Sequence, residues 1–169
     1  MKVALCPGTF DPVTNGHLDV ILRTAKHFEK VVVAVAGNPE KSPMFGIEER
    51  LAMLNECFAD KGNIEVVAFD CLLIDIAHEV GSCVIVKGLR AMSDFEFEFQ
   101  MAQFNRQMDE NIETFFVMAT PEYTYLSSSG IKEVVSYGGS INGLVPEPVA
   151  RRFYERFGKD SAAGASGKE

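Results

Sequence analysis

The sequence predicts an α/β fold: a Rossmann-like, doubly wound, five-stranded parallel sheet with helices on both faces. Its apolar runs are short, and the run at residues 31–36 is rich in β-branched residues without polar alternation, which is typical of strands covered on both faces. Segments with helical spacing of apolar residues separate these runs. Strands that alternate with helices form parallel sheets through right-handed crossovers, and such sheets bind ligands at the carboxyl ends of their strands.

Length and composition indicate one soluble domain. The 169 residues suit a single substantial core, which we expect over residues 1–157, with residues 158–169 as a disordered tail. No apolar run approaches the length of a membrane span, and no secretory signal pattern opens the chain. The four cysteines form no C-x-x-C pair, so we expect reduced thiols and a cytoplasmic location.

The net charge of −8 argues against a general nucleic-acid partner, because neutralising a phosphate backbone requires a basic face. A small phosphorylated ligand is compatible with this charge, since it needs only a few local cations.

The order of the expected elements follows from the apolar runs and from the turn residues between them. We expect strands at residues 3–6, 31–36, 64–69, 83–86 and 114–118. We expect helices at residues 18–28, 47–58, 72–80, 127–137 and 148–157.

The segment 94–108 is ambiguous. Residues 94–100 alternate strictly between polar and apolar, which is a strand pattern, but the apolar spacing continues to Met108 without a turn residue. This length favours a helix, with Ser93 as its N-cap, over a strand hairpin. Its apolar residues cover more than one face, so we expect it to pack on the sheet and on a neighbouring subunit.

The stretch 8–17, Gly-Thr-Phe-Asp-Pro-Val-Thr-Asn-Gly-His, joins the first strand to the first helix. Unpaired amides and the dipole make a helix N-terminus attractive to phosphate. His17 lies in the first helical turn, where its ring can donate to a phosphate oxygen. A Thr-x-Gly-His tetrad alone is compatible with simple capping, but its position directly after a strand favours phosphate contact.

Three further segments end at the same edge of the sheet. Lys87 and Arg90 flank Gly88, and the Arg90 guanidinium can fork across a triphosphate. Residues 127–129 are serines at a helix start, which can cap the helix or bind a β,γ-phosphate. Lys41 lies in the loop after the second strand, where a surface role and a phosphate-binding role are equally compatible with the sequence.

The chain has no P-loop, no kinase signature and no nucleophile–base pair of the hydrolase kind. Phosphate-binding groups without a covalent catalyst suit in-line attack at phosphorus, where positioning and charge stabilisation do most of the work.

Four segments together resemble bacterial phosphopantetheine adenylyltransferases, which are nucleotidyltransferases with a T/H-x-G-H motif. The resemblance covers about residues 2–157 and rests on residues 7–17, 41–45, 88–96 and 127–133. It implies transfer of an adenylyl group from ATP to 4′-phosphopantetheine, which gives dephospho-CoA and pyrophosphate in coenzyme A biosynthesis. It also implies Mg²⁺ bound with ATP, a homohexamer, and a single nucleotidyltransferase domain; we assign no residue as a metal ligand.

The resemblance implies a role for each matching residue. His17 would stabilise the transition state at the α-phosphorus, and Thr9 would orient the attacking phosphate, with Lys41 and Arg90 also in the catalytic set. Lys41, Lys87 and the backbone near Leu73 would bind phosphopantetheine together with Thr9. The residues implied to bind ATP are Thr9, Phe10, His17, Gly88, Leu89, Arg90, Glu98, Tyr123, Thr124, Tyr125, Leu126, Ser127, Ser128 and Ser129.

This sequence departs from the family pattern at two positions. Lys87 stands where the family usually has arginine; a lysine keeps the charge but lacks the planar fork, so we expect weaker phosphopantetheine binding. Cys71 stands where another small or polar residue is usual, and we carry no role to it.

Two rival functions are also compatible with the sequence. One is an adenylyl- or cytidylyltransferase for a different phosphorylated acceptor, and the other is a catalytically dead nucleotide sensor. The presence of His17, Thr9 and Arg90 argues against the sensor.

Overall fold

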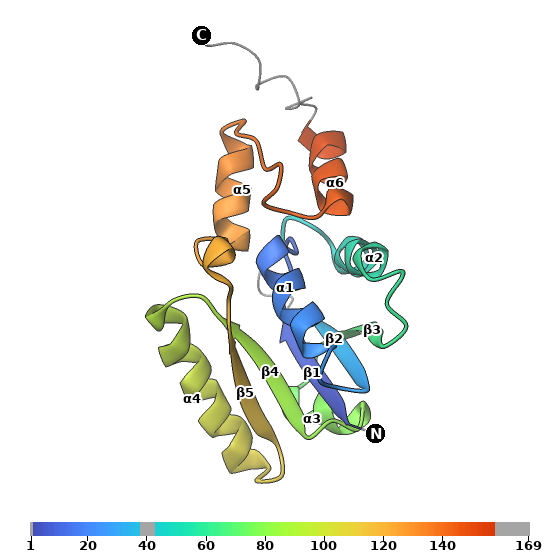
Figure 1. The fold of residues 1–169 in the computed structure, drawn as a ribbon, viewed down its shortest axis with the longest axis vertical. Coiled ribbons are helices and arrows are strands. Elements are labelled where there is room, and N and C mark those ends of the chain that lie inside the picture. The colour runs from blue at the N-terminus through green and yellow to red at the C-terminus, as the bar shows by residue number, and fades with distance from the viewer. Residues whose placement is uncertain (1, 38–42, 158–169) are drawn as a thin grey trace.

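A computed structural model describes residues 2–37 and 43–157 and confirms the predicted fold class (Figure 1). Five parallel strands form one sheet in the order β3-β2-β1-β4-β5. The strands are β1 (Val3–Gly8), β2 (Lys30–Ala36), β3 (Ile64–Phe69), β4 (Val84–Leu89) and β5 (Glu113–Met118). The helices are α1 (Asn15–Thr24), α2 (Ile47–Cys57), α3 (Leu73–Glu79), α4 (Met92–Met108), α5 (Ser128–Ser136) and α6 (Glu147–Phe157), with a 3₁₀ turn at Pro121–Tyr123.

The central strands are apolar on both sides because each side packs on a different core. Alternate residues of β2 point to opposite faces, as the two-residue period of a strand requires. Val31, Val33 and Val35 pack in the larger cluster with residues of α1, α2, α5 and α6. Val32 and Ala34 pack in a smaller cluster that includes residues of α3. Helices therefore cover both faces, and Figure 1 shows α1 lying across the sheet near its centre.

Strand β4 is longer than expected. Lys87, Gly88 and Leu89 belong to the strand itself, paired with residues 116–118 of β5, whereas the sequence predicts a strand that ends at Val86. A Cβ added to Gly88 would lie 3.1 Å from Cγ2 of Val20 on α1. Glycine at this position therefore allows α1 to approach the end of β4 closely.

Helix α1 begins three residues before its expected start and ends earlier. It starts at Asn15, with Thr14 as N-cap, and Ala25 is its C-cap, so Phe28 lies beyond the helix. Phe28 still packs against the larger core cluster, which explains why its spacing looked helical.

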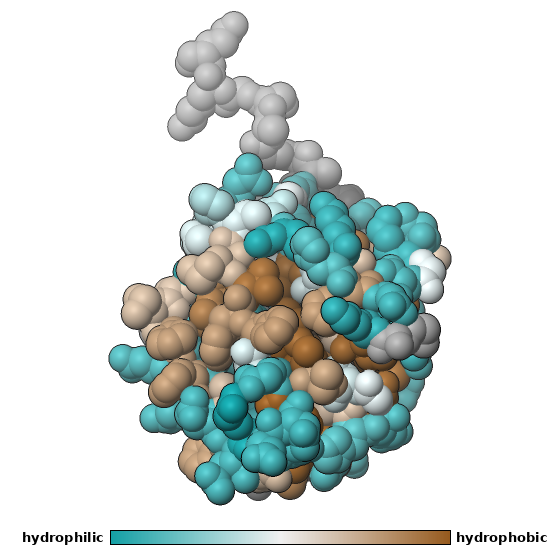
Figure 2. Space-filling model, turned by 60° about the horizontal axis from the view of Figure 1, so that its bottom comes forward, coloured by the Kyte–Doolittle hydropathy of each residue, from teal (hydrophilic) through white to brown (hydrophobic). Residues whose placement is uncertain are grey.

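The segment 94–108 is a helix, as expected, and the hairpin alternative is wrong. Helix α4 begins at Met92, and its N-cap is Ala91 in extended conformation, so the expectation of Ser93 as N-cap is also wrong. Several large apolar side chains of α4 and β5 are exposed, among them Phe97, Phe104 and Phe115. Figure 2 shows apolar side chains gathered at the surface on the left of the view, the side of α4 and β5.

Within residues 2–37 and 43–157, we find no helix with the length and apolar character that a membrane span requires.

Candidate active site

The β1–α1 turn holds His17 in a defined orientation. The backbone N–H of Thr14 donates to Nδ1 of His17 at 3.0 Å, and the Thr14 hydroxyl accepts from the backbone N–H of His17 at 3.4 Å. The two residues thus form a reciprocal capping box at the start of α1. Because Nδ1 accepts a hydrogen bond, the neutral ring carries its proton on Nε2, which is free to donate to a ligand.

Burial keeps the His17 ring neutral. Desolvation, with a smaller contribution from the positive charge of Arg90, lowers the pKa of His17 from 6.5 to about 4. His17 is therefore an uncharged hydrogen-bond donor at neutral pH.

Phe10 packs against His17 in a strained backbone conformation. Its φ of 49° lies in the left-handed region that non-glycine residues rarely adopt. Its ring lies edge to face with the His17 ring, with 5.2 Å between the ring centroids. A Cβ on Gly8 would lie 2.8 Å from the Phe10 ring, so the glycine makes room for this side chain. The turn therefore positions an aromatic ring beside the histidine.

A cavity of about 730 Å³ lies at the carboxyl ends of β1 and β4, and both His17 and Phe10 line it. Other predicted site residues that line the same cavity are Thr9, Lys87, Gly88, Arg90, Glu98, Leu126, Ser127, Ser128 and Ser129. The segments predicted to meet at one edge of the sheet, from β1, β4 and the start of α5, are thus brought together.

The cations of the β4–α4 segment are already paired with carboxylates. Nζ of Lys87 lies 3.0 Å from Oε2 of Glu98, and each side chain is 20% exposed. The Arg90 guanidinium forks onto Asp94, with Nε donating to Oδ2 at 3.0 Å and Nη2 to Oδ1 at 3.1 Å. Its Nη1 donates to the carbonyl of Leu126 at 2.7 Å. The fork expected to face a triphosphate is engaged with protein groups in this structure.

The serine triplet caps α5. The hydroxyl of Ser127 accepts from the backbone N–H of Gly130 at 2.9 Å, as an N-cap does. Ser128 donates to the carbonyl of Pro12 at 2.7 Å, which ties α5 to the β1–α1 turn. The capping role is therefore present, and all three serines also line the cavity.

Some predicted site residues fall outside this cavity lining. In the described ranges, Leu73, Leu89, Tyr123, Thr124 and Tyr125 are not part of the cavity lining. Leu89 is buried, and Leu73 packs in the smaller core cluster. Lys41 lies outside the described residues.

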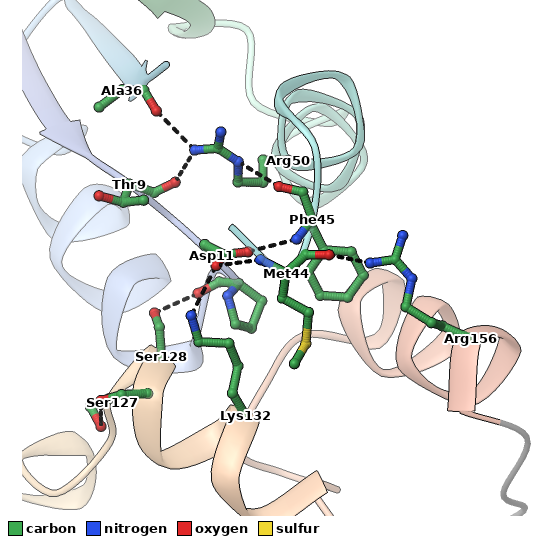
Figure 3. A network of polar contacts seen from close by, with 12 residues as sticks. Thr9, Asp11, Ala36, Met44, Phe45, Arg50, Ser127, Ser128, Lys132 and Arg156 are labelled. Atoms are coloured by element: carbon green, nitrogen blue, oxygen red, sulfur yellow. Dashed lines mark hydrogen bonds and ion pairs between the residues drawn. The ribbon is translucent and has the colours of Figure 1, made fainter. Parts of the chain in front are cut away.

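Sequence reasoning missed two buried charged residues next to the site, Asp11 and Arg50 (Figure 3). Asp11 is 4% exposed, and its carboxylate accepts from the amides of Met44 at 2.9 Å and Phe45 at 2.8 Å. Lys132 also donates to Asp11 at 2.9 Å. These bonds and the positive charge of Lys132 outweigh burial and hold the pKa of Asp11 below its usual value. The spacing of Arg50 to the buried Met53 and Leu54 on α2 could have indicated its burial.

Within the described residues, no three histidine, cysteine or carboxylate side chains come together in a group able to hold a metal ion. The two carboxylates in the cavity lining, Asp94 and Glu98, face Arg90 and Lys87. This donor set suits a metal ion that arrives with phosphate oxygens and water as its main ligands.

The chain is similar to known proteins over most of its length. The Cytidylyltransferase-like family matches residues 5–134. The phosphopantetheine adenylyltransferase of Caldanaerobacter subterraneus subsp. tengcongensis is 50% identical over 159 residues, which cover 94% of this chain and 99% of the relative. That of Symbiobacterium thermophilum is 54% identical over 159 residues, 94% of this chain and 98% of the relative. That of Clostridium tetani is 51% identical over 149 residues, 88% of this chain and 93% of the relative.

Proposed function

Since this chain belongs to the phosphopantetheine adenylyltransferases, nucleotidyltransferases of coenzyme A biosynthesis, we propose that it transfers the adenylyl group of ATP to 4′-phosphopantetheine by direct in-line attack. A phosphate oxygen of phosphopantetheine forms a bond to the α-phosphorus, and the bond from that phosphorus to the α,β-bridging oxygen breaks, so that the β- and γ-phosphates leave together. The products are dephospho-CoA and pyrophosphate. No covalent enzyme intermediate is required.

The observation that carries this mechanism is the neutral His17 at the N-terminus of α1. Its Nδ1 is occupied by the Thr14 amide, so Nε2–H is left to donate to a ligand in the cavity. Negative charge develops on the α-phosphate oxygens during attack, and a fixed donor stabilises it most in the transition state. We assign His17 as the transition-state stabiliser.

The acceptor binds, in this proposal, beside the end of β1. Thr9 follows β1 at the cavity and orients the attacking phosphate, while the Lys87 ammonium attracts the same phosphate. Lys41 completes the phosphate site from the β2–α2 loop, and the backbone near Leu73 meets the pantetheine arm. These roles follow from the family resemblance.

ATP binds, in this proposal, between the β4–α4 segment and the start of α5. Arg90 and the serines of residues 127–129 contact the phosphates, and the amides of the first turn of α5 add to the positive field there. Phe10, Gly88, Leu89, Glu98 and residues 123–126 complete the nucleotide site. Mg²⁺ bound with ATP would neutralise charge on the leaving pyrophosphate, and we assign no residue of this chain as its ligand.

We further propose that the enzyme works in the cytoplasm as a homohexamer. The exposed apolar side chains of α4 and β5, including the 63% exposed Phe104, give another copy of the chain a surface to cover. Light scattering after size exclusion tests this assembly, with six times the 18.6 kDa chain mass expected. A monomer mass at micromolar concentration would contradict it.

The reaction is tested by pyrophosphate release from ATP and Mg²⁺, with and without 4′-phosphopantetheine. We expect release only with the acceptor, and dephospho-CoA by mass spectrometry. CTP in place of ATP is the control for the wider Cytidylyltransferase-like family. ATP binding without release would point to a different acceptor, and release from CTP to a different nucleotide.

A further inference from the structure

Every backbone hydrogen-bonding group of the dipeptide Met44–Phe45 is bound by a charged side chain (Figure 3). Asp11 accepts from both amides. Arg50 Nε donates to the carbonyl of Phe45 at 3.0 Å, and Arg156 of α6 donates to the carbonyl of Met44. Such a dipeptide uses no secondary structure for its polar groups, so these three side chains satisfy them, while the fully buried Phe45 ring anchors the dipeptide in the core.

Arg50 joins this dipeptide to the ends of two strands. It is 3% exposed, and besides Phe45 it donates from Nη1 to the carbonyl of Thr9 at 2.8 Å and to that of Ala36 at 2.9 Å. One planar guanidinium thus holds three carbonyls from three segments of the chain. Lysine has one donor atom and cannot reproduce this geometry.

The strained residue Phe10 lies between Thr9 and Asp11, and hydrogen bonds to other segments of the chain hold both of these neighbours. Arg50 fixes the carbonyl of Thr9 on one side, and Asp11 is fixed on the other by Met44, Phe45 and Lys132. A left-handed φ at a bulky residue persists only where the surroundings enforce it. The Thr9 carbonyl points to Arg50, and its hydroxyl oxygen lies at the opposite end of the residue (Figure 3).

We propose that Arg50 and Asp11 are positioning residues that hold the turn Thr9–Phe10–Asp11 in its left-handed conformation. This conformation aims Thr9 at the attacking phosphate and presses the Phe10 ring against His17, 5.2 Å away between centroids. Neither Arg50 nor Asp11 lines the cavity, so both act through the turn. The inference rests on the proposed function, because the role of Thr9 comes from it.

The primary test is steady-state kinetics of Arg50→Lys, with active sites titrated. We expect kcat/KM for phosphopantetheine to fall about 10²-fold, since misplacing a reacting group by about 1 Å costs that much, while the ATP Kd changes less than about fivefold. Arg152→Lys is the matched control: Arg152 also donates to a carbonyl, that of Pro148, and pairs with a carboxylate, that of Glu56, but lies away from the cavity. It should keep wild-type kinetics.

Two more variants separate positioning from folding. In Arg50→Ala, millimolar guanidinium should restore kcat per active site, whereas ammonium should not. In Asp11→Asn, one of the two amides loses its acceptor, and we expect the same fall in kcat/KM for phosphopantetheine. This variant keeps the test open if Arg50→Ala does not fold.

Each outcome decides one question. If wild type forms no dephospho-CoA, the proposed function fails. If wild type is active but Arg50→Lys and Asp11→Asn keep wild-type kcat and KM per active site, the positioning role is overturned and the network only stabilises the fold. A loss confined to substrate affinity, with kcat per active site unchanged, would overturn it as well.

Discussion

The polar groups on two sides of the cavity differ in charge and in bonding. The β1–α1 wall contains Thr9, Phe10 and His17, and the β4–α4 wall contains Lys87, Arg90, Asp94 and Glu98. On the β1–α1 wall, His17 is neutral and accepts a backbone hydrogen bond at Nδ1, and its Nε2–H has no hydrogen-bond partner among the described residues. On the β4–α4 wall, Lys87 and Arg90 are charged and already paired with Glu98 and Asp94. The first wall can act on a ligand without rearranging, whereas the second must exchange carboxylate partners for phosphate.

This difference separates catalysis from binding. A preorganised neutral donor contributes most where charge develops in the transition state, because no reorganisation is needed then. A paired cation contributes to substrate binding only the difference between its interaction free energies with phosphate and with its carboxylate partner. This difference is small for partly exposed pairs. Changes on the β1–α1 wall should therefore affect kcat strongly, and changes on the β4–α4 wall should affect substrate affinity modestly.

The largest effect is expected from His17→Ala. Loss of the Nε2–H donor should lower kcat about 10²–10⁴-fold, while the ATP Kd stays near wild type, because the contact is made mainly in the transition state. Rapid-quench kinetics and ATP titration calorimetry measure the two quantities. His27→Ala, at an exposed position after α1, is the matched control and should keep wild-type kcat. An unchanged kcat in His17→Ala would refute the catalytic assignment.

The second effect concerns the protonation of His17. Burial lowers its pKa to about 4, so the ring stays neutral in the folded protein at pH values where an unfolded histidine is already charged. Its contribution to stability is therefore complete above about pH 6.5 and is lost progressively as the pH falls toward 4, a change of about 3 kcal/mol. Nitrogen-15 NMR, assigned with His17→Gln, should find the Nε2–H tautomer and a pKa near 4. A pKa near 6.5, or an Nδ1–H tautomer, would contradict the burial argument.

The contrast between the walls also marks what sequence alone could predict. The strands, the helix at 94–108 and the place of His17 follow from local apolar spacing and from the strand–turn–helix order. The Asp94 partner of Arg90 is four residues along the chain, within reach of sequence reasoning, although we expected Arg90 to face phosphate. The bonds of Asp11 to Phe45 and Lys132 span 34 and 121 residues, and only the tertiary fold brings such groups together.

Glu98→Gln tests the β4–α4 wall directly. Removing the carboxylate charge frees Lys87 for the acceptor phosphate, so the Kd of phosphopantetheine should fall about two- to fivefold, the scale of a partly exposed ion pair. Calorimetry in the absence of ATP measures this step alone, which avoids the proposed contact of Glu98 with ATP. Glu96→Gln, on an exposed position of the same helix, is the control. Weaker binding would mean that Glu98 orients Lys87 and does not compete with the phosphate.

The smallest effect is expected from Lys87→Arg, which restores the residue usual in the family. An arginine can donate to Glu98 and to a phosphate at once, because its donors form a planar fork, whereas the lysine ammonium must share one nitrogen between them. Phosphopantetheine should therefore bind about twofold more tightly, with kcat unchanged, because the cation acts on binding and not on the reacting phosphorus. Calorimetry measures the Kd of phosphopantetheine, and steady-state kinetics on the same preparation measures kcat. Weaker binding in this variant would mean that the β4–α4 wall is built around an ammonium group, with Glu98 placed for its shorter reach.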